Sequence, residues 1–153
     1  MNDDRFVYVT YIRTTPDKLW EALTTPEFTR RYWFGVSLES DWTLGASWKL
    51  VFQDGRIADA GEVLEIDPPR RLVLSWRHEL RPDLHAEGFA KATFDLEPRE
   101  ELVKLTVVHE IDRQGSKLIE AVSGGWPMIL SSLKSLLETG AAHPRTGQAP
   151  KAA

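Results

Sequence analysis

The sequence predicts one α+β domain in which a long C-terminal amphipathic helix covers a curved antiparallel sheet. Between residues 47 and 110, successive segments alternate apolar and polar side chains, which is typical of strands with one wet face. The apolar residues from Leu118 to Leu136 recur instead every three or four positions, the period of a helix. The 153 residues are enough to build one core without a disulfide or a metal.

The chain is expected to begin with a strand and two short helices. Residues 5–13 are rich in β-branched and aromatic side chains, which favours a strand. Thr15 and Pro16 suit the N-cap and the first turn of a helix. Thr25 and Pro26 repeat that signal for a second short helix. We expect these helices to close one end of the sheet.

The middle of the chain is predicted to form an antiparallel meander, because short turns separate its strands. Asp54-Gly55 is a hairpin signal. Asp67-Pro68-Pro69 ends a strand, since proline cannot donate to a ladder. With the first strand, we expect about six or seven strands in all. The predicted segments are 47–53, 57–66, 71–78, 86–97 and 102–110.

The closing helix carries one apolar stripe, interrupted by the sequence Gly-Gly-Trp-Pro. Its members are Leu118, Val122, Trp126, Ile129, Leu133 and Leu136. At roughly 1.5–3 kcal/mol for each buried side chain, the stripe could contribute on the order of 10 kcal/mol, so the helix belongs to the core. A proline inside a helix costs about 3 kcal/mol, so we expect the helix to restart with Pro127 in its first turn. We predict a domain over residues 1–139 and a disordered tail over 140–153, which lacks apolar periodicity.

Composition and charge exclude several classes of function. The net charge is −4, from 19 basic and 23 acidic residues, which argues against a nucleic-acid partner. The chain has no cysteine, so it has no thiol nucleophile or thiolate metal site, and we expect a cytoplasmic protein. The polar start is unlike a signal peptide, and no apolar run is long enough to span a membrane. We expect no cofactor and no metal, and a monomer or a homodimer.

Six tryptophans favour either a large core or an aromatic-lined pocket, and both interpretations stay open. Gly88, Ala90 and Ala92 are small residues that would leave volume under the helix. His109 points inward and is either a ligand contact, a general acid/base or a hydrogen-bonded core histidine. His78 shares a face with Trp76 and is the weaker candidate. The predicted ligand-binding residues are Trp33, Phe34, Trp48, Trp76, Phe94, His109 and Trp126, and no catalytic residue is assigned.

Five segments, in order along residues 5–139, carry a family resemblance. They are 15–26, Tyr32-Trp33-Phe34-Gly35, 61–72 with Ser75-Trp76, 105–110, and Gly125-Trp126 followed by Leu130, Leu133 and Leu137. Together they resemble the activator-of-Hsp90-ATPase-homologue-like family of the START-like (SRPBCC) superfamily. The resemblance implies the helix-grip fold, with a ligand pocket between sheet and helix.

Three functions follow as alternatives. The first, which we expect, is binding of a small hydrophobic or aromatic molecule in an internal cavity. The second is a co-chaperone-like module acting on a chaperone ATPase, as the family name implies. The third is a cyclase or hydrolase that uses His109 with a carboxylate.

Overall fold

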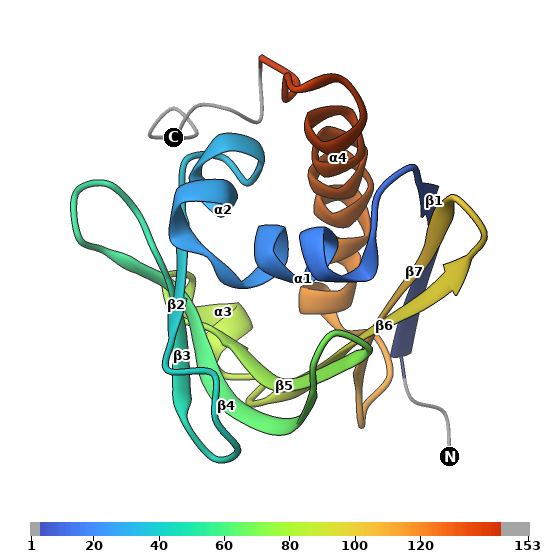
Figure 1. Cartoon of the computed structure of the whole chain (residues 1–153). Coiled ribbons are helices and arrows are strands. Elements are labelled where there is room, and N and C mark those ends of the chain that lie inside the picture. Colours follow the sequence, from blue (N-terminus) through green and yellow to red (C-terminus); the bar gives the residue numbers. More distant parts are fainter. Residues whose placement is uncertain (1–3, 145–153) are drawn as a thin grey trace.

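A seven-stranded antiparallel sheet curves around a long helix in the computed structural model, which describes residues 4–144 (Figure 1). The strands are β1 (Asp4–Ile12), β2 (Ser37–Ser40), β3 (Ser47–Val51), β4 (Ile57–Asp67), β5 (Arg71–His78), β6 (Ala90–Arg99) and β7 (Leu102–Ile111). The helices are α1 (Pro16–Thr24), α2 (Pro26–Tyr32), α3 (Pro82–His85) and α4 (Lys117–Thr139). The α+β architecture predicted from the sequence is confirmed.

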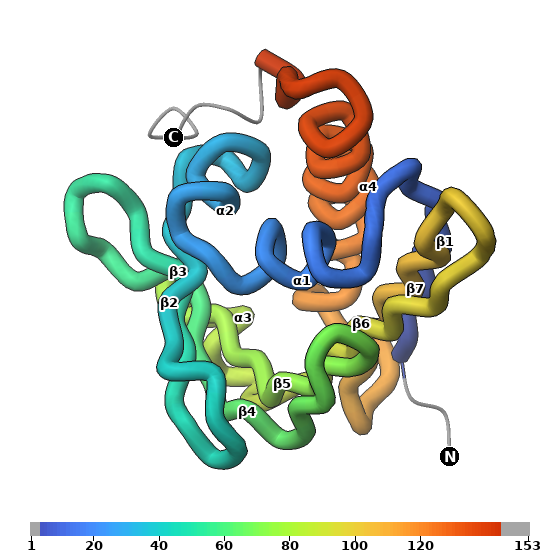
Figure 2. Tube along the Cα trace, viewed as in Figure 1, coloured from blue at the N-terminus to red at the C-terminus, as the bar shows by residue number. Residues whose placement is uncertain are grey.

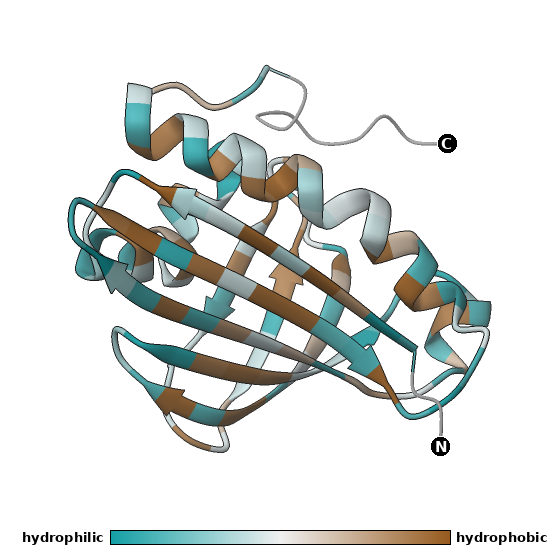
Figure 3. Ribbon diagram, turned by 90° about the vertical axis from the view of Figure 1, so that its right-hand side faces the viewer, coloured by the Kyte–Doolittle hydropathy of each residue, from teal (hydrophilic) through white to brown (hydrophobic). Residues whose placement is uncertain are grey.

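The sheet order is β1-β7-β6-β5-β4-β3-β2, so every neighbour except β1 and β7 is also a neighbour in sequence. The first strand therefore joins the last one at the end of the meander (Figure 2). Hydrophobic and hydrophilic residues alternate along the strands, as the coloured bands of Figure 3 show. In β7, Val103, Leu105, Val107 and His109 are buried, whereas the residues between them are partly exposed. This alternation turns one face of the sheet toward α4.

The two short helices follow the predicted start signals. The hydroxyl of Thr15 accepts a hydrogen bond from the backbone N–H of Lys18 at 3.2 Å, and Pro16 occupies the first turn. α2 begins at Pro26, as expected. The buried hydroxyl of Tyr32 donates to the carbonyl of Ala22 at 2.9 Å, which ties α2 to α1. Both predicted starts are confirmed.

An irregularity in β4 explains why its sequence lacks clean alternation. Its register against β5 shifts between Val63 and Glu65, as it does at a β-bulge. Glu62 and Glu65 are both exposed. A side chain at Gly61 would put its Cβ 1.8 Å from the carbonyl oxygen of Ser75, so only glycine fits there.

The expected restart of the last helix at Pro127 is wrong, because α4 runs unbroken from Lys117 to Thr139 with Pro127 inside it. Buried residues lie on both sides of the proline: Leu118 and Ile119 before it, Ile129, Leu130, Leu133 and Leu136 after it. Docking of both halves on the sheet offsets the roughly 3 kcal/mol cost of an internal proline.

Two short elements are absent from the sequence prediction. β2 is only four residues long, and α3 forms where a loop is expected, with Pro82 in its first turn. Because β6 begins at Ala90, Gly88 lies in the preceding turn with φ 82° and not on the strand.

Beyond α4, the described chain folds back along the helix. The hydroxyl of Ser135 donates to the carbonyl of Ala141 at 2.7 Å, and the N–H of His143 donates to Ser132 at 3.0 Å. The rest of the predicted tail, 145–153, lies outside the described residues. Within residues 4–144, no helix has the length and apolarity needed to cross a bilayer.

Candidate functional site

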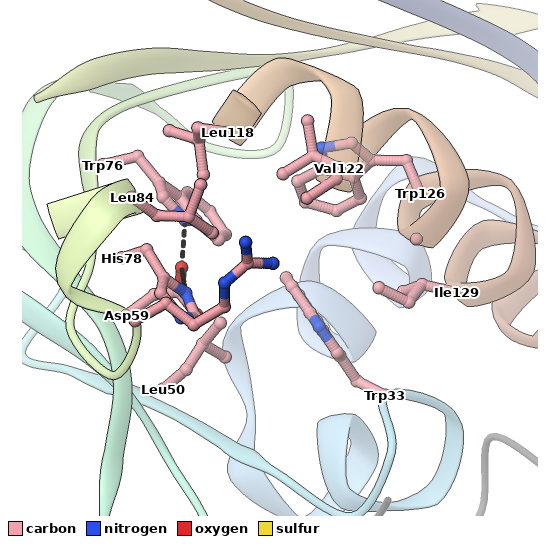
Figure 4. A pocket seen from close by; sticks show the side chains of 13 residues that line it. Trp33, Leu50, Asp59, Trp76, His78, Leu84, Leu118, Val122, Trp126 and Ile129 are labelled. Atoms are coloured by element: carbon pink, nitrogen blue, oxygen red, sulfur yellow. Dashed lines mark hydrogen bonds and ion pairs between the residues drawn. The ribbon is translucent and has the colours of Figure 1, made fainter. Parts of the chain in front are cut away.

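A pocket of about 250 Å³ lies between the sheet and the N-terminal half of α4 (Figure 4). It falls just below the roughly 300–1,000 Å³ of typical small-molecule sites. Its dimensions therefore suit a molecule of about one or two rings. The lining residues are Trp33, Leu50, Asp59, Trp76, His78, Arg81, Leu84, Leu118, Ala121, Val122, Gly125, Trp126 and Ile129.

Three tryptophans from three different elements form the aromatic wall of this pocket. Trp33 caps α2 and stacks on Trp76 of β5, with ring centroids 6.2 Å apart and planes at 16°. Trp126 of α4 lies 5.3 Å from Trp33 and 5.6 Å from Trp76 in tilted and edge-on geometries. Offset and edge-to-face pairs are the preferred aromatic arrangements. The three rings hold one another in place and present a rigid wall.

A second layer of aromatic rings supports this wall from behind. Trp48 lies 4.4 Å from Trp76 and donates its indole N–H to the carbonyl of Ser75 at 2.8 Å. Phe94 meets Trp126 edge-on at 5.7 Å. Both rings are buried and do not line the pocket.

His109 belongs to the same second layer and is fully buried. Its Nδ1 accepts the indole N–H of Trp126 at 3.0 Å. Because an indole can only donate, the ring proton of neutral His109 sits on Nε2. Burial lowers the pKa of His109 to about 3, so the ring is uncharged at neutral pH. No hydrogen bond or ion pair joins His109 to a carboxylate within the described residues.

The polar end of the pocket is a hydrogen-bonded group of Asp59, Trp76 and His78. Oδ2 of Asp59 accepts the indole N–H of Trp76 at 2.8 Å and lies 3.3 Å from Nδ1 of His78. Only 14% of the Asp59 side chain and 19% of the His78 side chain are exposed. A carboxylate accepts hydrogen bonds, so in the neutral ring of His78 Nδ1 carries the proton and Nε2 keeps a lone pair. That Nε2 atom is buried and has no partner among residues 4–144.

Strand register brings these polar groups together. Asp59 pairs with His78 across β4 and β5, and with Leu50 across β3 and β4. Trp76 lies two positions before His78 and therefore on the same face of β5. The sequence shows that Trp76 and His78 share a face, but the register that sets Asp59 opposite them depends on the irregularities in β4.

The loop after β5 adds a charged group at the edge of the pocket. Arg81 and Leu84 line it from the segment around α3. The guanidinium of Arg81 forms an ion pair with Asp83 at 2.9 Å, and 58% of the Arg81 side chain is exposed. The residues that line the pocket thus include one acidic and one basic side chain besides His78.

The predicted ligand-binding residues separate into two layers. Trp33, Trp76 and Trp126 border the pocket. Trp48, Phe94 and His109 lie behind them in the core, and Phe34 packs against the core from the turn after α2. The sequence analysis did not predict Asp59 or the residues of α3 as part of the site. For α3, Pro82 was the available signal, since proline is favoured in the first turn of a helix.

A metal centre finds no support in this geometry. Within residues 4–144, no three His, Cys, Asp or Glu side chains gather closely enough to hold an ion. The chemistry that the pocket offers is therefore aromatic contact and hydrogen bonding.

Comparisons with solved structures show the same fold in other proteins. A protein from Mesorhizobium loti superposes with a TM-score of 0.75 at 23% identity, covering 88% of this chain and 97% of that one. The Aha1 dimer from Colwellia psychrerythraea gives a TM-score of 0.72 at 19% identity, covering 90% and 98%. An HSP90 activator from Plasmodium falciparum gives 0.71 at 21% identity, covering 87% and 95%. These likenesses confirm the helix-grip fold.

No curated protein matches the sequence of this chain. The family model described as "Activator of Hsp90 ATPase homolog 1-like protein" matches residues 13–138, most of the chain. The chain therefore belongs to the family of Activator of Hsp90 ATPase homolog 1-like proteins.

Proposed function

We propose that this protein binds a small hydrophobic or aromatic molecule in the pocket bordered by Trp33, Trp76 and Trp126. The observation that carries the proposal is a pocket of about 250 Å³ bordered by three mutually packed indole rings. An apolar pocket with a few converging polar groups is the usual form of a small-molecule site.

The rigidity of the wall favours binding. Ordering flexible side chains on association costs free energy, and a wall that is already ordered avoids that cost. Trp76 is fixed by its stacking on Trp33 and by its hydrogen bond to Asp59. A planar aromatic ligand could add one more ring to an existing set of favourable ring contacts.

The glycines of α4 provide the experiment. Gly125 lines the pocket, and a Cβ there would have Ile129 as its nearest contact at 4.0 Å. Gly124 is exposed, and a Cβ there would meet nothing within 4 Å. Gly125→Leu therefore fills the pocket, while Gly124→Leu makes the same exchange on the solvent side of the helix.

A mixture of small aromatic and apolar compounds would be screened by the shift in melting temperature and by ligand-observed NMR. We expect wild type and Gly124→Leu to bind the same compounds and Gly125→Leu to lose them. Failure of every compound to bind wild type, or equal binding by Gly125→Leu, would contradict the proposal.

A second candidate is a co-chaperone-like role, which family membership and the likeness to an HSP90 activator favour. Such a role would use the outer surface, so Gly125→Leu would leave it intact. The test is the ATPase rate of a purified chaperone of the Hsp90 type with saturating protein. An unchanged rate of ATP turnover would remove this candidate.

A further inference from the structure

We infer that the pocket selects a neutral aromatic ligand whose hydroxyl group donates a hydrogen bond to the Asp59–His78 pair. This inference rests on the proposed function and names the chemistry of the ligand. It starts from the two acceptor atoms of the pair, Nε2 of His78 and Oδ1 of Asp59, that make no hydrogen bond within the described residues.

The first open acceptor is Nε2 of His78. Asp59 holds the ring through Nδ1 at 3.3 Å, so in the neutral ring the proton is on that nitrogen and the lone pair is on Nε2. This lone pair is buried without a partner in the described part of the chain. A buried acceptor without a partner destabilises a protein, so a ligand donor that reaches this atom would gain a favourable hydrogen bond.

The second open acceptor is Oδ1 of Asp59. Both interactions of this carboxylate, with Trp76 and with His78, use Oδ2. Asp59 lines the pocket and keeps part of its side chain exposed. Because Nε2 of His78 is covered, a ligand hydroxyl reaches it only after a neighbouring side chain moves, whereas Oδ1 belongs to a residue that already faces the pocket.

The charges around the pocket favour a neutral ligand. Asp59 would repel a carboxylate and attract an ammonium group, and Arg81, which also lines the pocket, would do the reverse. A charge of either sign on the ligand therefore meets one attractive and one repulsive group, while its desolvation costs free energy. A hydroxyl group can donate to the Asp59–His78 pair and accept from Arg81, so it suits both charges.

The aromatic wall determines which apolar group the rest of the ligand should carry. Trp33, Trp76 and Trp126 offer ring faces and edges, and Leu50, Leu84 and Val122 complete an apolar surface. A phenol-type molecule with a short apolar substituent combines a ring for the wall and a hydroxyl for the polar end. We choose 4-ethylphenol as the probe for this class.

The matched ligand is 4-ethylanisole, which keeps the ring and the oxygen but cannot donate a hydrogen bond. Isothermal titration calorimetry would measure both dissociation constants for the wild-type chain. We expect 4-ethylphenol to bind roughly tenfold more tightly, the ratio that one buried hydrogen bond of ordinary strength gives. The anion 4-ethylbenzoate and the cation 4-ethylbenzylammonium, as the charged counterparts, should bind more weakly than the phenol.

Three variants locate the effect. His78→Phe removes one acceptor and should abolish most of the preference for the phenol while retaining ring binding. In Asp59→Asn, an amide oxygen in the place of Oδ2 can still accept from Trp76 and from Nδ1 of His78, while the amide nitrogen in the place of Oδ1 turns that acceptor into a donor. This variant should lose or reverse the preference. His85→Phe is the control, because His85 is exposed and does not line the pocket.

The outcomes separate this inference from the proposed function. Equal binding of 4-ethylphenol and 4-ethylanisole by wild type would overturn the inference and leave the proposed function standing. Tighter binding of a charged counterpart would also overturn it. Binding of none of the probes would overturn both. A preference that His78→Phe and Asp59→Asn keep unchanged would show that the hydroxyl is recognised elsewhere.

Discussion

Two histidines on the inner face of the sheet make opposite use of the same side chain. His109 of β7 is sealed in the core, where Nδ1 accepts the indole N–H of Trp126. His78 of β5 lies at the pocket, where Nδ1 faces the carboxylate of Asp59. A partner that only donates and a partner that only accepts place the ring proton on opposite nitrogens. One histidine therefore secures the packing of α4, and the other keeps an acceptor available beside the pocket.

Burial and the chemistry of the hydrogen-bond partner, more than residue type, therefore distinguish a histidine that stabilises the core from one that can contact a ligand. Desolvation dominates at His109 and lowers its pKa to about 3. At His78 the ring keeps some exposure and an ordered tautomer.

The comparison first predicts unequal costs of truncation. His109→Ala leaves a cavity in the core and an indole N–H of Trp126 without an acceptor, so we expect a loss of about 3–5 kcal/mol of unfolding free energy. His78→Ala removes a partly exposed ring and should cost about 1 kcal/mol or less. Urea unfolding of both variants measures the difference, and equal losses would break the comparison.

The low pKa of His109 predicts a dependence of stability on pH. The unfolded chain binds a proton on this ring between the ordinary pKa of 6.5 and about 3, and the folded chain does not. Stability therefore falls as the pH drops through that window, by about 2 kcal/mol between pH 7 and pH 5 from this residue.

His109→Gln provides the control for this pH dependence, because its amide oxygen can still accept the N–H of Trp126. Its unfolding free energy should fall less than that of wild type over the same range. Parallel pH profiles of the two chains would contradict the assignment.

The start of α4 offers a third test, because it forms one wall of the pocket. Glu87 accepts hydrogen bonds from the hydroxyl of Ser116 at 2.6 Å and from the N–H of Lys117 at 2.9 Å. Burial would raise the pKa of Glu87, but these hydrogen bonds outweigh it and lower the pKa. Glu87→Gln should cost about 1 kcal/mol.

Glu120→Gln removes the same charge from the exposed first turn of α4 and should cost less than Glu87→Gln. Thermal unfolding of both variants provides the comparison. Equal losses would show that the charge near the helix start matters and the hydrogen bonds of Glu87 do not.

The smallest expected effect concerns helix propensity beside the pocket. Gly124→Ala should raise the unfolding free energy by about 0.5–1 kcal/mol, since glycine is costly inside a helix and nothing lies within 4 Å of the added methyl. A loss of stability in this variant would show that α4 needs glycine at this point for another reason. Chemical denaturation at neutral pH measures the change.

Most of the fold was accessible from the sequence, because strand alternation and the apolar stripe of the last helix are local patterns. Thr15-Pro16 marked α1 correctly for the same reason. The continuity of α4 through Pro127 was not accessible, since it depends on docking against the sheet, which no local rule contains.

The candidate site was likewise predictable only where local sequence patterns determine it. Aromatic composition singled out Trp33, Trp76 and Trp126, which border the pocket. It could not separate them from Trp48 and Phe94 in the layer behind, because all five side chains are buried and apolar. Asp59 was missed because its place opposite His78 is set by strand register across an irregular strand.

The most direct test of the pocket is the response of the indole N–H signals in a two-dimensional ¹H–¹⁵N NMR spectrum as 4-ethylphenol is added. The six tryptophans give separate probes, of which Trp33, Trp76 and Trp126 border the pocket and Trp20, Trp42 and Trp48 do not. The account predicts that the first three signals shift most, with saturation at a one-to-one ratio. No shift, or shifts confined to Trp20 and Trp42, would contradict it.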